Sequence, residues 1–180
     1  TGTQLVRDYG ICPYAGSRCE DGGPALNTLA YGATPAGYLG MQNCPRCRHF
    51  ITGPVFLGGL SALWTEISLN VTLVYEKYSD LEKQTAENKQ MIQALDREQA
   101  MCIRAGIEFD ETRRLGLELA NSRLHSDMES LATKMDLHLC DMQAITRNIN
   151  ESRVILNNQA EASTEGENMP LQLIATDRSD

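Results

Sequence analysis

The chain has 180 residues, of which 42% are hydrophobic and 6% aromatic, and its formal net charge is −8. This length allows one large domain or two small ones and excludes a complete multidomain enzyme. No apolar run approaches the roughly 20 residues that cross a bilayer, and no basic segment precedes a hydrophobic stretch at the start. We therefore expect a soluble, cytoplasmic chain with no membrane partner and no small-molecule substrate. Because the sequence opens at Thr1 rather than Met, we also expect it to be a piece of a longer protein.

The charge is distributed unevenly along the chain. Residues 1–53 carry four basic and three acidic side chains, residues 54–158 carry 11 and 16, and residues 159–180 carry one and five. Non-specific binding to nucleic acid depends on neutralising phosphates, so most of this chain would be repelled by nucleic acid. Only the first segment escapes that repulsion.

Residues 1–53 are rich in Gly, Pro, Cys and Tyr, and they contain too few large apolar residues to bury a core. Four of the six cysteines lie here, with six residues between Cys12 and Cys19 and two between Cys44 and Cys47. Four thiolates complete the tetrahedral shell of a structural Zn²⁺ and leave no position open for chemistry. The favoured interpretation is therefore a structural zinc site formed by these four cysteines.

Two other roles of the cysteines stay open. A redox pair normally opens a helix within a βαβ pattern, which is absent here. Two disulfides need an oxidising compartment, for which no targeting signal is visible, and they would leave Cys102 and Cys140 free. Within the zinc interpretation, the first pair is spaced more widely than usual, and this spacing is tolerable if Gly16 makes a turn. His49 is a substitute ligand, although its closeness to Cys47 favours a packing role.

Three arginines flank the cysteine pairs, namely Arg18, Arg46 and Arg48. Their structural role would be to offset the negative charge of the zinc-bound thiolates. Their functional role would be to contact phosphates, and this is the basis of an alternative: a zinc-dependent nucleic-acid-binding module with the rest of the chain as spacer or dimeriser. The segment's low net charge favours the structural role.

A helix is expected from residue 54, because Pro54 suits the first helical turn. Gly106 is expected to end this helix after Ala105, and Asp110 to cap a second helix. A seven-residue repeat, with steps of alternately four and three residues, places mostly apolar residues on one face of both segments. They are Leu60, Trp64, Ile67, Val71, Val74, Tyr78, Leu81, Thr85, Asn88, Ile92, Leu95, Gln99 and Cys102, then Leu117, Asn121, Leu124, Met128, Leu131, Met135, His138, Met142, Ile145, Ile149 and Leu156.

These observations predict a mainly α fold. A small four-cysteine zinc-knuckle module (residues 1–53) precedes a long antiparallel, coiled-coil-like hairpin of helices 54–105 and 110–158. Since two helices leave their seam half covered, we expect a third surface to cover it: the N-terminal module, a second chain or another part of a longer protein. An acidic, mostly flexible tail (159–180) follows, whose apolar stretch 169–175 either docks on the hairpin or adds an edge strand.

The sequence contains no phosphate-binding glycine loop, no nucleophile elbow and no paired acid and base outside the charged helix faces. We therefore expect no enzymatic activity from this chain. His138 and the methionines at the seven-residue repeat are expected to fill the core.

Two stretches together resemble a known family. They are residues 10–19, with the first cysteine pair, and residues 43–60, which run from Asn43-Cys44-Pro45-Arg46-Cys47 into the first helix. They resemble the C-terminal region of a family of phage integrases, tyrosine-recombinase-like proteins of bacterial mobile elements. The resemblance covers about residues 5–160, and the cysteine segment is its specific part.

The resemblance implies a bacterial parent protein that performs site-specific DNA recombination and integration through an upstream catalytic domain. None of the six tyrosines here stands in a recombinase motif, so no catalytic role is transferred to them. The chain would then be a non-catalytic accessory domain that mediates protein contacts, through self-association or with another part of the recombination complex. DNA would be contacted through the parent protein.

Overall fold

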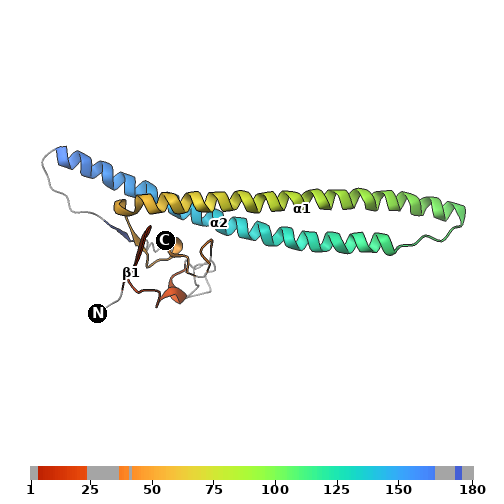
Figure 1. The fold of residues 1–180 in the computed structure, drawn as a ribbon, viewed down its shortest axis with the longest axis horizontal. Helices are drawn as coiled ribbons and strands as arrows, with labels where there is room; N and C mark the ends of the chain where they lie inside the picture. Colours follow the sequence, from red (N-terminus) through yellow and green to blue (C-terminus); the bar gives the residue numbers. More distant parts are fainter. Residues whose placement is uncertain (1–3, 24–36, 41, 165–172, 176–180) are drawn as a thin grey trace. The chain divides into compact units, whose positions relative to one another are not determined.

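The computed structural model describes residues 4–23, 37–40, 42–164 and 173–175, and it is mainly helical. Helix α1 spans Leu57–Ala105 and follows a short 3₁₀ helix at Pro54–Phe56, and helix α2 spans Thr112–Thr164. The two helices run side by side in opposite directions (Figure 1). The predicted helical hairpin is confirmed.

Local interactions end α1 and begin α2 where the sequence predicts them. Gly106 has a φ of +68°, its N–H donates to the Ile103 carbonyl at 3.2 Å, and the Ile107 N–H donates to the Cys102 carbonyl at 2.9 Å. This pair of bonds is a Schellman motif. The Asp110 carboxylate accepts the Thr112 N–H at 2.9 Å, and this side chain's hydrogen bonds with Thr112 lower the pKa of Asp110.

Helix α2 is longer than predicted, since it continues past residue 158 to Thr164. The prediction ended the helix where the apolar repeat stops, but residues 159–161 are Gln159, Ala160 and Glu161, which are intrinsically good helix formers. The first residues of the predicted flexible tail are therefore helical. The rest of that prediction falls mostly on residues 165–172 and 176–180, which lie outside the described residues.

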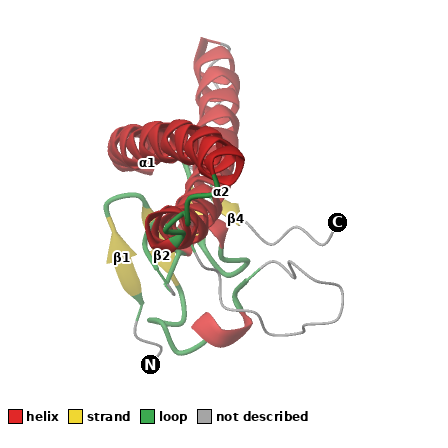
Figure 2. Cartoon of the chain, turned by 90° about the vertical axis from the view of Figure 1, so that its right-hand side faces the viewer, coloured by secondary structure: helices red, strands yellow, loops and turns green. Residues whose placement is uncertain are grey.

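A small antiparallel sheet of four strands accompanies the helices, in the order β1-β2-β3-β4. The strands are β1 (Leu5–Arg7), β2 (Gly10–Cys12), β3 (Ile51–Thr52) and β4 (Ile174–Ala175). Figure 2 shows β1 and β2 next to each other. Strand β4 pairs Ile174 with Thr52 and Ala175 with Ile51. Of the two alternatives for the apolar stretch in the tail, the edge strand is confirmed.

The chain forms two compact units, residues 1–71 with 136–180 and residues 72–135. The first unit contains a core of Leu60, Leu63 and Ile67 from α1 and Ile145 from α2. Tyr9, Tyr38 and Leu39 of the N-terminal segment pack against it. The expectation that the N-terminal segment covers part of the seam is confirmed for this unit.

In the second unit the helices meet along the predicted positions, which are mostly buried or half-buried. Val74 and Leu95 are buried apolar residues, whereas Thr85 and Asn121 are buried polar ones. Asn88 donates its side-chain N–H to Asn121 Oδ1 at 3.0 Å. Because a polar side chain in an apolar seam needs its partner opposite, this pair defines the register of the two helices.

Trp64 departs from the predicted seam, because its side chain is 36% exposed. Its indole N–H donates to Thr146 Oγ1 at 3.1 Å, so the ring lies over the contact between the helices rather than within it. Aromatic rings with a polar atom commonly take such a position.

The helical segment Pro54–Ala105 is long and apolar enough, by length and composition alone, to cross a membrane. Our sequence criterion missed it because Ser, Thr and Gly interrupt the apolar residues. This finding is weak support for a membrane segment, since core helices of soluble proteins have the same property. Leu60, Leu63 and Ile67 of this segment are buried in the first unit, but only 22% of its apolar 18-residue window is buried.

Two adjacent glycines in α1 provide a matched test of how the helix meets the N-terminal segment. A Cβ at Gly59 would overlap the backbone carbonyl of Asp8, whereas a Cβ at Gly58 would meet nothing. We expect Gly59→Ala to lower the free energy of unfolding by about 1–3 kcal/mol, as overpacking does. Gly58→Ala should raise it by up to about 1 kcal/mol, because alanine favours the helix. Denaturant unfolding of both variants measures the difference, and equal stabilities would contradict this packing.

Candidate metal centre

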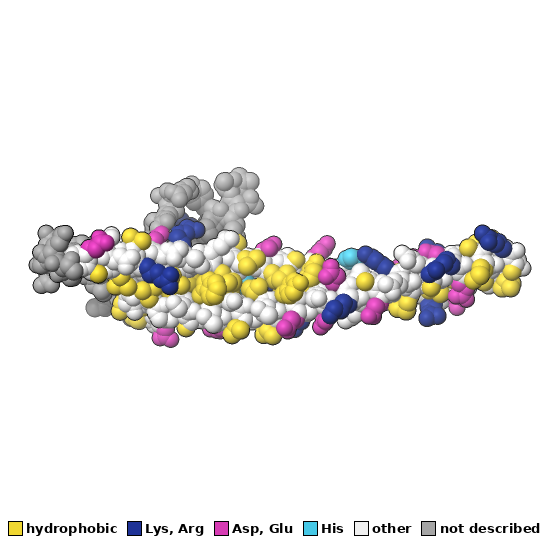
Figure 3. All heavy atoms as spheres, turned by 90° about the horizontal axis from the view of Figure 1, so that it is seen from above, with side chains coloured by type: hydrophobic (Ala, Val, Ile, Leu, Met, Phe, Trp, Pro, Cys, Tyr) yellow, Lys and Arg dark blue, Asp and Glu magenta, His cyan; other side chains and the backbone are white. Residues whose placement is uncertain are grey.

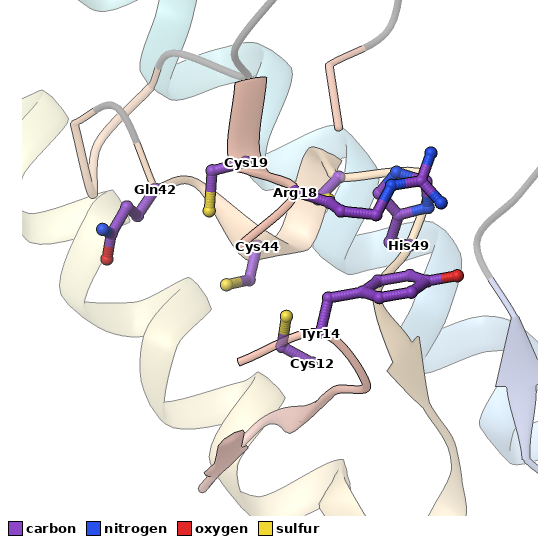
Figure 4. Close-up of a pocket in the computed structure, with 8 residues that line it drawn as sticks. Cys12, Tyr14, Arg18, Cys19, Gln42, Cys44 and His49 are labelled. Carbon is purple, nitrogen blue, oxygen red and sulfur yellow. The ribbon is translucent and has the colours of Figure 1, made fainter. Parts of the chain in front are cut away.

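The four cysteines of the N-terminal segment line one small cavity. Cys12 ends β2, Cys19 begins the 3₁₀ helix Cys19–Asp21, and Cys44 begins the 3₁₀ helix Cys44–Arg46, which Cys47 follows. The cavity measures about 20 Å³ and is also lined by Tyr14, Arg18, Gln42 and His49. Figure 4 shows the side chains of Cys12, Cys19 and Cys44 directed into the same space. A cavity of this size accommodates a single water-sized sphere.

Tight turns bring the two pairs of cysteines to this cavity. Between Cys12 and Cys19, Ala15 and Gly16 have φ values of +48° and +87°, so the turn at Gly16 that the wide spacing requires is present. Between Cys44 and Cys47, the Cys47 N–H donates to the Cys44 carbonyl at 2.9 Å. The two turns are joined by a hydrogen bond of 2.7 Å from the Arg48 N–H to the Gly22 carbonyl.

The cysteines share a cavity without approaching coordination distance. All six cysteines of the chain are free thiols. Within residues 4–23, 37–40, 42–164 and 173–175, no group of three or more His, Cys, Asp or Glu side chains is close enough to hold a metal ion. A tetrahedral zinc site requires each sulfur at about 2.3 Å from the metal. Cys12, Cys19, Cys44 and Cys47 are the residues that could supply it after a local contraction, and zinc binding stays a prediction.

Burial raises the pKa of the Cys44 and Cys47 thiols. The Arg7 guanidinium opposes this effect at Cys44, and the backbone of His49 opposes it at Cys47. Reactive redox cysteines depend on a lowered pKa, because the thiolate is the nucleophile. The environment of this pair therefore favours a structural role over a redox role.

Arg18 and His49 contact their own segment beside the cavity. Arg18 forms an ion pair with Asp21, and its guanidinium lies 4.9 Å from the centre of the Tyr14 ring. His49 Nε2 lies 2.9 Å from Asp21 Oδ1, and its ring meets the Tyr14 ring edge-on. These contacts favour the packing role of His49 that its spacing indicated.

The two remaining arginines are also engaged within the chain. The side chain of Arg46 is 8% exposed, and its Nη1 lies 3.7 Å from Asp141 Oδ1. The Arg48 guanidinium donates to the Gly23 carbonyl at 3.1 Å. Both arginines are thus held by contacts within the chain, and neither of these contacts is to a cysteine, so the offsetting of thiolate charge by these arginines stays a prediction. Contact with nucleic acid through Arg18, Arg46 and Arg48 stays a prediction.

Sequence reasoning missed two residues near the centre, Arg7 and Asp141. Arg7 stands on β1 and reaches the Cys44 thiol, which no spacing rule relates to it. Asp141 is fully buried and accepts hydrogen bonds from the Tyr38 N–H and the Asn43 side chain, each at 2.5 Å. The sequence does contain a signal for Asp141: it lies three residues after His138 and four before Ile145. This spacing places it on the inner face of the helix.

No known family model, curated protein or solved structure matches this chain.

The buried Cys44 thiol and the half-buried Cys47 thiol should react slowly in the reduced, metal-free protein. Because their pKa is raised, Cys44 and Cys47 carry less thiolate at neutral pH than an ordinary cysteine, and their alkylation should accelerate only as the pH rises towards that raised pKa. The exposed Cys140 serves as the internal control. Iodoacetamide labelling followed by mass spectrometry measures each site, and faster labelling at Cys44 than at Cys140 at pH 7 would contradict this.

Proposed function

We propose that this chain is a non-catalytic assembly domain, in which a structural zinc ion held by Cys12, Cys19, Cys44 and Cys47 orders the N-terminal segment and the helical hairpin contacts other proteins. The observation that carries the proposal is that four cysteines from two separate turns line one cavity of about 20 Å³. Zinc there would be closed to chemistry, because four thiolates fill its coordination shell.

The surroundings of the cavity suit a metal bound to thiolates. Four thiolates around Zn²⁺ leave an excess of two negative charges, and Arg7 and Arg18 are close to the sulfurs or line the cavity. A bound metal would add stability to the segment, because the described part of residues 1–53 contributes few large buried apolar side chains, Phe50 being one.

The proposed protein contacts rest on the exposed side of the helices in the first unit. Residues 57–71 carry one charged side chain, Glu66, whereas the chain as a whole has a net charge of −8. Leu69 on α1 and Val154 on α2 are 64% and 57% exposed. Figure 3 shows hydrophobic side chains gathered in a row on one face of the molecule. A charge-poor, apolar helix face lets a second acidic chain approach without repulsion.

The biological setting comes from the resemblance to phage integrases. In such a parent protein, an upstream domain would cut and rejoin DNA, and this chain would hold the recombination complex together through protein contacts. The acidic helices favour protein over DNA as the surface that the hairpin contacts.

Metal content tests the zinc site directly. We expect elemental mass spectrometry of the purified, reduced chain to find about one zinc per chain, and Cys12→Ser or Cys47→Ser to lose it because the tetrahedral shell needs all four thiolates. Cys140→Ser, which changes an exposed cysteine far along α2, should keep it. A wild-type chain without zinc would refute the proposed site.

Self-association tests the exposed helix face. We expect the wild-type chain to show a concentration-dependent mass above the monomer in sedimentation velocity. Leu69→Glu should weaken this association by about tenfold or more, since it places a charge on the apolar face. Gln84→Glu adds the same charge at an exposed polar position of α1 and should have little effect. A chain that remains monomeric at every concentration would exclude self-contact.

A further inference from the structure

Asp141 on α2 is a carboxylate with no exposed surface, and it is held by one loop of the N-terminal segment. Its Oδ2 accepts the Tyr38 backbone N–H at 2.5 Å, and its Oδ1 accepts the Asn43 side-chain N–H at 2.5 Å. Arg46 provides the positive charge, with Nη1 at 3.7 Å from Oδ1. A buried carboxylate is tolerated only where such donors and a counter-charge replace water.

The loop around Tyr38 is shaped to meet this carboxylate. A Cβ at position 37 would overlap both Asp141 oxygens and the Asn43 side chain, so only glycine fits there. The Tyr38 ring meets His138 edge-on with centres 5.3 Å apart, and its hydroxyl donates to Glu66 Oε1 at 2.8 Å. The loop is thus held between α1 and α2 at the point where Asp141 receives its N–H.

The same loop continues directly into the second cysteine pair. Asn43 immediately precedes Cys44, and Arg46 lies between Cys44 and Cys47, within the turn that presents both sulfurs to the cavity. Two of the groups that satisfy Asp141 therefore belong to the turn that would bind zinc. Any change in this turn moves the partners of a fully buried charge.

We propose that Asp141 couples zinc binding to the docking of the N-terminal segment, and we call this coupling the Asp141 latch. Zinc bound by the four cysteines orders the Cys44–Cys47 turn, which places Asn43 and Arg46 on Asp141. These contacts attach the N-terminal segment to the helices of the first unit. This inference rests on the zinc site proposed above. Loss of zinc loosens the turn, leaves Asp141 without its counter-charge, and releases the segment from the core of Leu60, Leu63 and Ile145.

Because of thermodynamic linkage, the coupling between docking and zinc binding can be measured as a change in zinc affinity. If zinc strengthens the docking of the segment, docking must strengthen zinc binding by the same factor. Asp141 does not contact the cavity, so a change in zinc affinity caused by Asp141 would report the coupling rather than a lost ligand.

The experiment compares the zinc dissociation constants of full-length variants by competition with a chelator of known affinity. Asp141→Asn and Arg46→Gln should each weaken zinc binding by at least about fivefold, the lower end of typical coupling. The double variant should be little weaker than either single variant, because both remove the same contact. Asp136→Asn, an exposed acidic position five residues earlier on α2, should bind zinc as the wild type does.

A second measurement uses only the wild-type chain. Amide hydrogen exchange of β3 and of the α2 segment around Ile145 should become faster when zinc is removed. Unchanged exchange, wild-type affinity in Asp141→Asn, or equal weakening by Asp136→Asn would each overturn the latch while leaving the zinc site intact. A wild-type chain that binds no zinc would instead overturn the proposed site, and the coupling with it.

Discussion

The organisation of the first unit depends on a buried carboxylate, that of Asp141. Removing one partner from a buried ion pair costs about 3–5 kcal/mol, so the side chain must keep its donors whenever it is enclosed. The donors are Tyr38 and Asn43 and the counter-charge is Arg46, all about a hundred residues earlier in the chain. These polar contacts fix the position of the loop on the two helices. Apolar contacts alone would fix it less precisely.

The N-terminal segment is too small to bury a core of its own, and it is completed by distant parts of the chain. Tyr9, Tyr38 and Leu39 pack on apolar residues of α1 and α2, and β4 from the end of the chain extends the sheet. Hydrophobic contacts supply most of this association and the polar contacts of Asp141 supply its geometry. The candidate metal site would stabilise the described turns that carry the four cysteines.

In the helices, too, apolar contacts provide the burial and a few polar contacts set the geometry. In the second unit, Val74 and Leu95 exclude water, while the hydrogen bond from Asn88 to Asn121 allows one alignment of the helices. Buried polar pairs of this kind lower stability and raise specificity. The long helices thus have a defined register although their apolar seam is narrow.

Sequence alone determined the elements that depend on local interactions. The ends of the helices near Pro54, Ala105 and Asp110 follow from capping, and the inward positions follow from the seven-residue repeat. The cysteine spacing identified the residues that share a cavity. Only the tertiary structure revealed the sheet, the approach of Arg7 to Cys44 and the partners of Asp141. These contacts join residues far apart in the chain, so they arise from packing, which local propensity and spacing do not encode.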